Sequence, residues 1–241
     1  MLTTPEIRNV YEKIQKQLFY MIPEKWDKVY LYASVLDHYN NIQTGEMFFY
    51  YYPKSVLKKN PVNVYEVPER FNIDEAAYLK LAEKLYDEIK TLRNILIQKG
   101  EKPWTNITIS IEDFKFKVEY SYEDLVNSKY TSYDRHIIWR YKYLDIPLTS
   151  LLKKDRKMVE EYLSKEKYYN KNITTYNEGI YKKPVSNIMK YDKEETDNKV
   201  EVKTTNELEN KQENNIENKI EEKQVKDETT IKSQILNFKS E

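Results

Sequence analysis

The sequence predicts an α+β fold, in which helices pack against a mostly antiparallel sheet of two hairpins and short strands. Three observations support this class: helical spacing of apolar residues in the long segments, alternation in two pairs of shorter segments, and turn residues within each pair. Between Ile7 and Ile22 apolar residues recur at three- and four-residue steps, which predicts an N-terminal helix. Thr4 and Pro5 mark its start, and Pro23 marks its end.

Both hairpins are predicted from alternating side chains. Residues 29–35 alternate aliphatic with aromatic or polar side chains, residues 37–45 are turn-prone, and residues 47–52 form an aromatic run bounded by Pro53. Residues 106–111 and 114–122 alternate in the same way and should turn near Glu112 and Asp113. Shorter strands near residues 62–67 and over residues 137–144 are expected to extend the sheet.

A long central helix is predicted between Asn72 and Gly100. Asn72 followed by Glu75 has the form of a capping box, and apolar residues from Tyr78 to Leu96 keep helical spacing. Residues 150–163 predict a C-terminal helix. We therefore expect one folded domain over residues 1–165.

Residues 166–241 form a separate region by composition. Lys, Glu, Asn and Thr dominate there, and Phe238 is the only aromatic residue after Tyr191. Such a segment cannot bury enough apolar surface to offset the entropy of ordering it. We expect a charged, disordered tail.

Composition excludes several kinds of site. The chain has 40 basic and 40 acidic residues, so no overall field attracts nucleic acid or an anionic membrane. It has no cysteine, which rules out disulfides and thiolate metal sites, and its 3 glycines cannot build a phosphate-binding loop. The first residues lack the apolar core of a signal peptide, and no apolar run approaches the roughly 20 residues of a membrane span. We expect a cytoplasmic protein without a cofactor.

Seven short segments follow one another in a fixed order within residues 5–163. They are Ile22-Pro-Glu-Lys-Trp26, Lys28-Val-Tyr-Leu-Tyr-Ala33, Phe49-Tyr-Tyr-Tyr-Pro53, Phe71-Asn-Ile-Asp-Glu75, Lys102-Pro-Trp-Thr-Asn106, Tyr120-Ser-Tyr-Glu-Asp-Leu125 and Ile138-Trp-Arg-Tyr-Lys-Tyr-Leu144. This succession resembles the YezG/EsaG family of immunity proteins. The resemblance implies an antitoxin without enzymatic activity. Its partner would be a nuclease toxin exported by a type VII secretion system of Gram-positive bacteria, bound without direct contact to nucleic acid or membrane.

The chain departs from the family pattern at two turns. Asp145 stands where the family usually has glycine, and Glu112-Asp113 stand where the second hairpin turn usually has one. The tail after residue 166 has no counterpart in the pattern. The family brings no catalytic residues, so contact residues must be argued from chemistry.

Tyrosines of the first hairpin are one candidate for toxin binding. Tyr30 and Tyr32 lie opposite the aliphatic side of their strand, and Tyr50 and Tyr52 lie on the partner strand. Two interpretations remain open. Helices cover both faces of the hairpin, or one tyrosine-rich face is a binding surface.

Carboxylates at the end of the second hairpin are the other candidate. Glu119, Glu123 and Asp124 are expected at the surface, where they would complement the cations with which a nuclease binds phosphates. Arg135 and Arg140 are alternative partners for these carboxylates within the fold.

Two further functions are weighed against the inhibitor hypothesis. Asp113-Phe114-Lys115 has the Asp-x-Lys form of metal-dependent nucleases, although an exposed turn also explains it. Tyr30, Tyr50 and Tyr52 would allow a sheet-face RNA-binding module to stack bases. The histidines, His38 and His136, are expected at the surface or in loops.

Overall fold

The computed structural model describes residues 4–38, 42–55, 60–113, 115–165 and 173–179, and for the last range it describes the backbone only. The described strands form a six-stranded sheet in the order β5-β4-β1-β6-β7-β8 and a two-stranded sheet of β2 and β3. The strands are β1 (Trp26–Ser34), β2 (Leu36–Asp37), β3 (Gln43–Thr44), β4 (Met47–Pro53), β5 (Val62–Asn63), β6 (Asn106–Glu112), β7 (Lys115–Ser121) and β8 (Ile173–Gly179). The helices are α1 (Pro5–Met21), η2 (Val64–Glu66), α2 (Val67–Phe71), α3 (Glu75–Gln98), α4 (Ser132–Tyr143), η3 (Leu148–Ser150) and α5 (Lys153–Ser164).

Strand β1 is central and antiparallel to both of its neighbours. Tyr30 lies opposite Tyr50 of β4 and Ser110 of β6, so the two predicted hairpins join through β1 and β6. Strand β7 pairs with β6 over seven residues without a register shift. The predicted α+β class and both hairpins are confirmed.

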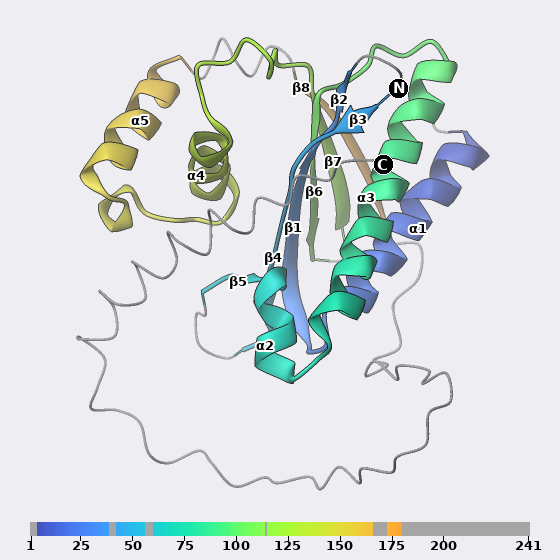
Figure 1. The fold of residues 1–241 in the computed structure, drawn as a ribbon, viewed down its shortest axis with the longest axis horizontal. Helices are drawn as coiled ribbons and strands as arrows, with labels where there is room; N and C mark the ends of the chain where they lie inside the picture. The colour runs from blue at the N-terminus through green and yellow to red at the C-terminus, as the bar shows by residue number, and fades with distance from the viewer. Residues whose placement is uncertain (1–3, 39–41, 56–59, 114, 166–172, 180–241) are drawn as a thin grey trace, which may run out of the picture. The chain divides into compact units, whose positions relative to one another are not determined.

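Helices α1 and α3 cover one face of the sheet. The predicted start of α1 is confirmed, because the Thr4 side chain accepts a hydrogen bond from the Ile7 N–H. The Tyr78 hydroxyl of α3 donates to the Met21 carbonyl at 2.8 Å, and the Tyr11 hydroxyl of α1 bonds that of Tyr120 in β7. These contacts tie the two helices to each other and to the sheet, and Figure 1 shows both helices lying beside it.

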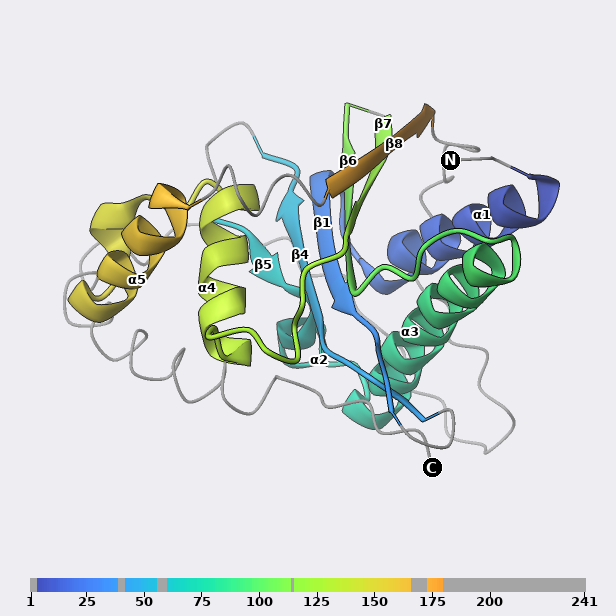
Figure 2. The ribbon, with the colours of Figure 1, turned by 90° about the horizontal axis from the view of Figure 1, so that it is seen from above.

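Helix α4 covers the opposite face of β1 and β4, and α5 packs on the far side of α4 (Figure 2). The expectation of a strand over residues 137–144 is therefore wrong. A capping box starts α4: Thr131 accepts from the Asp134 N–H, and the Asp134 carboxylate accepts from the Thr131 N–H. Residues 150–163 are confirmed as mainly helical, with α5 at Lys153–Ser164.

Two local predictions around α3 also need correction. Asn72 does not cap this helix. It has φ of 51° and ends α2, while Asp74 is the N-cap of α3 and accepts from the Ala77 N–H at 2.7 Å. Strand β5 is only two residues long, since the backbone enters η2 and α2 directly after Asn63. The predicted end of α3 is confirmed, with Gly100 at φ of 83°.

One strand lies beyond the predicted domain boundary at residue 165. Strand β8, which the sequence assigns to the tail, pairs with β7 along its whole length. The rest of the predicted tail lies outside the described residues.

Candidate functional site

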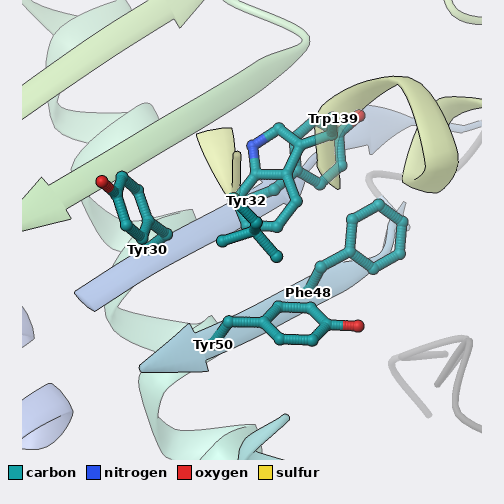
Figure 3. Packing of buried hydrophobic residues seen from close by; sticks show 6 residues of the cluster. Tyr30, Tyr32, Phe48, Tyr50 and Trp139 are labelled. Carbon is teal, nitrogen blue, oxygen red and sulfur yellow. The ribbon is translucent and has the colours of Figure 1, made fainter. Parts of the chain in front are cut away.

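The tyrosine-rich face of the first hairpin is covered by α4. Tyr30, Tyr32 and Tyr50 are only 5–6% exposed, and they pack with Phe48 against Trp139 of α4 (Figure 3). The rings of Tyr32 and Phe48 are stacked with centroids 4.9 Å apart. The sequence left two interpretations of this hairpin open. The structure shows the one in which helices cover both of its faces.

The hydroxyl groups of this face connect the sheet to α4 and to the hairpin turn. The Tyr30 hydroxyl donates to Glu112 at 2.7 Å, and the half-buried Tyr52 donates to the Leu144 carbonyl at 2.8 Å. The Tyr50 hydroxyl forms a 2.9 Å hydrogen bond with Nε2 of His136. Tyr30 and Tyr50 are therefore not free to stack on RNA bases in this conformation, so two of the three rings on which the RNA-binding alternative depends are covered.

His136 is buried within α4, and the expectation of a surface or loop position is wrong for it. Its ring stacks on Phe48 with centroids 4.1 Å apart. Burial, reinforced by the nearby charge of Arg140, lowers the pKa of His136 to about 3. His136 is therefore a neutral packing residue at physiological pH. His38 is exposed, as expected.

Beyond the tyrosines, a groove runs between α4 and the second hairpin. It encloses a cavity of about 80 Å³. We call it the α4–β7 groove and define it by the polar residues of its lining, which are Asn106, Thr108, Glu119, Ser121, Glu123, Arg135 and Lys142. It has this composition because α4 lies over β1 and β4, so the polar side of β6 and β7 is only partly covered.

Glu119 and Glu123 line this groove, while Asp124 lies beside it at the surface. The Glu119 carboxylate accepts from the Tyr143 hydroxyl and pairs with Lys117. Burial raises the pKa of Glu123, although Arg135 and Lys142 oppose the shift. Hydrogen bonds from Asn127 lower the pKa of Asp124. Glu119 and Glu123 line the same groove and Asp124 follows Glu123 in the chain, and we call these three carboxylates the acidic edge.

Only Asp124 has the open surface position expected for all three. The Glu119 side chain is 17% exposed and Glu123 is half-buried, because the aromatic side of α4 packs beside β7. Arg135 pairs with Glu46 across 3.1 Å rather than directly with the acidic edge. The groove thus holds two carboxylates and two cations, and its charges nearly balance.

Asp113 and Lys115 lie at the tip of the second hairpin. Asp113 is exposed with φ of 47°, which confirms the predicted turn. The neighbouring carboxylate of Glu112 is bound by Tyr30 and by Lys28, the latter at 3.2 Å. Within the described ranges, no three His, Asp or Glu side chains are grouped to bind a metal ion.

Lys142 and Tyr143 are groove residues that sequence reasoning missed. Both come from α4, which was expected to be a strand, so their positions could not be derived. The signal that predicts this helix is present in the sequence as Thr131 followed three residues later by Asp134.

Comparison with known proteins identifies the family. The family model described as "Immunity protein YezG-like" matches residues 7–160, which contain all of the described strands except β8. The chain belongs to the YezG-like immunity protein family. Members of this family are immunity proteins and not enzymes, so the resemblance noted in the sequence is confirmed and the nuclease alternative is not supported.

Relatives from two genera match over most of their length. "Immunity protein YezG" of Bacillus spizizenii is 31% identical over 164 residues, covering 67% of this chain and 96% of the relative. "Immunity protein YezG" of Bacillus subtilis is 28% identical over 141 residues, covering 58% and 89%. "Type VII secretion system protein EsaG" of Staphylococcus aureus is 27% identical over 161 residues, covering 66% and 94%. Among the described helices, none has both the length and the apolarity to cross a membrane.

Proposed function

We propose that this immunity protein is a cytoplasmic antitoxin that binds a cognate nuclease toxin and inhibits it by occluding the active site. The family match over residues 7–160 carries the immunity role. The similarity to the Staphylococcus aureus type VII secretion protein supports a toxin exported by that route. The nuclease assignment rests on the family resemblance and on the chemistry of the acidic edge.

The α4–β7 groove and its acidic edge are the proposed contact surface. Nuclease active sites present cations to phosphates, so a partner that offers carboxylates there gains complementary potential and faster association. Asp124 is exposed and ionised for this purpose. Glu119 is held in place by Tyr143 and Lys117, so its orientation is fixed before the toxin arrives.

The four tyrosines have different roles in this proposal. Tyr52 is half-buried and is close enough to the surface to contribute contact area. Tyr30, Tyr32 and Tyr50 do not contact the toxin but support the interface, because their packing against Trp139 positions α4. An interface of roughly 800 Å² per partner would cover the groove and its rim.

The test captures the partner of this protein from its native cell and then measures inhibition and binding kinetics with the nuclease domain of that partner. Neutralising the acidic edge with Glu119→Gln, Glu123→Gln and Asp124→Asn should slow association by about tenfold at low salt, with a smaller dependence on ionic strength. Glutamine and asparagine are chosen over lysine because Glu119 and Glu123 are not fully exposed. An unchanged association rate would remove the acidic edge from the interface.

A matched control makes the same change of charge on the opposite side of the sheet. Glu75, Glu83 and Asp87 are exposed residues of α3, and their neutralisation should leave association unchanged. The proposal also predicts that the purified chain with magnesium leaves DNA and RNA intact. If the protein inhibits none of the nucleases that it captures from its native cell, the antitoxin mechanism is refuted.

A further inference from the structure

Strand β8 occupies the outer edge of β7. Seven consecutive residues pair, from Lys115 opposite Gly179 to Ser121 opposite Ile173. On its other side β7 is paired with β6. In the sheet of the described residues, β8 therefore separates the edge of β7 from solvent.

This covering strand comes from outside the family region. The family model ends at residue 160, whereas β8 begins at Ile173. The Bacillus spizizenii relative matches over 96% of its length with only 67% of this chain. The matched region supplies β7 but, among the described strands, no partner for its outer edge.

The β7 strand has the properties of a strand acceptor. It is seven residues long, contains no proline, and keeps a regular register with β6. Phe116, Val118 and Tyr120 are fully buried on the side of α1, which holds the strand rigid. Natural edge strands are usually blocked by proline, a bulge or a short length, because unpaired N–H and C=O groups pair readily with another chain. In this protein β8 protects the edge of β7 instead of a proline, a bulge or a short strand length.

We propose that the outer edge of β7 is a strand-acceptor site, which this chain fills with its own β8 and which binds an extended, proline-free segment of a partner protein when β8 leaves. Main-chain hydrogen bonds would supply the affinity, as in other cases of strand addition. The site is continuous with the acidic edge, because Glu119 belongs to β7 and Glu123 follows it. If that partner is the toxin, this identification rests on the proposed function, whereas the strand-acceptor site itself does not.

The first test releases β8 in the full chain. Adjacent strand residues point their N–H groups to opposite sides, so Thr174→Pro combined with Thr175→Pro must remove one N–H that faces β7. The control combines Thr174→Val with Thr175→Val, which keeps both N–H groups. The probe is a fluorescein-labelled peptide of residues 171–181, and the measurement is fluorescence anisotropy.

The proline variant should bind this peptide at least tenfold more tightly than the wild type and the valine control. Equal binding by all three would overturn the proposal. Self-association of the proline variant without peptide binding would also overturn it, because the occupant would then be a second copy of the chain. No toxin is present in this assay, so failure of the antitoxin proposal would not change its result.

The second test does not depend on how well the proline variant folds. The chain has no cysteine, so Ser121→Cys with Ile173→Cys introduces one pair at directly opposed positions of β7 and β8. The oxidised form should not bind the peptide. Failure of the disulfide to form, or peptide binding by the fully oxidised protein, would overturn the proposal.

Discussion

Asp145 shows how a single residue other than glycine can occupy a backbone position that favours glycine. It follows Leu144, the C-cap of α4, and has φ of 49°, a left-handed conformation that helices commonly use at their ends. Asp113 in the second hairpin turn has φ of 47°. Aspartate tolerates this conformation better than most residues, which explains how it can occupy both turns.

Substitutions at Asp145 should follow backbone preference rather than charge. Asp145→Gly removes steric strain but adds entropy to the unfolded chain, so the free energy of unfolding should change by less than about 0.5 kcal/mol. Asp145→Val should lower it by about 1–2 kcal/mol. Urea denaturation measures both values. Equal stability of the two variants would contradict the role assigned to positive φ.

Burial of His136 should make stability depend on pH. The unfolded chain binds a proton at this residue below a pKa of about 6.5, whereas the folded chain does so only near 3. The unfolded state therefore binds more protons between these values, and stability falls as pH falls through this window.

His136→Gln should reduce that dependence. Between pH 7 and pH 5 the wild type should lose about 2 kcal/mol more free energy of unfolding than the variant. Other titrating groups, including Glu123 with its raised pKa, are common to both proteins and cancel in the difference. Urea titrations at the two pH values provide the measurement. Identical pH slopes of the two proteins would show that the pKa of His136 is the same in the folded and unfolded chains.

At the scale of elements, α4 explains what the sequence could and could not predict. His136, Trp139 and Tyr143 face the sheet, while Ile137, Ile138 and Tyr141 face α5. A helix that is apolar on two sides loses the single stripe that identifies α1 and α3. Its β-branched and aromatic residues then resemble a buried strand, and only the capping box distinguishes the two.

The candidate site was predictable only in part for the same reason. The acidic edge lies at the end of a clearly alternating hairpin, so the sequence places its three members near one another. Their partial burial depends on α4, whose position relative to β7 follows from tertiary packing. The tyrosines show the same limit, because strand alternation gives their face but does not say what covers it.

Helix α3 has a clear apolar stripe and provides a test of fold integrity. Leu85 is fully buried, and Leu85→Asp should unfold the domain, because a buried unpaired carboxylate costs several kcal/mol against a total of roughly 5–15. Lys84→Asp places the same side chain at an exposed neighbouring position and should leave the fold intact. Circular dichroism compares the two, and a folded Leu85→Asp protein would contradict this account of the core.

At the scale of the whole molecule, the sheet joins the helix pair α1 and α3 to the helix pair α4 and α5. The first pair buries the aliphatic side of β1, β6 and β7, and the second covers the aromatic side of β1 and β4. This division leaves the polar side of β6 and β7 to form the α4–β7 groove. The sequence predicts the sheet and the pair of α1 and α3. It does not predict the pair of α4 and α5, because it assigns the residues of α4 to a strand.

Truncation separates the two parts of the predicted tail. A chain ending at residue 182 keeps β8 and should melt within about 2 °C of the full chain, because the residues removed carry little apolar surface. A chain ending at residue 165 loses β8 and exposes the edge of β7, so it should self-associate as its concentration rises. Sedimentation velocity and thermal melting of both chains check this. A shorter chain that stays monomeric at high concentration would show that the β7 edge needs no cover.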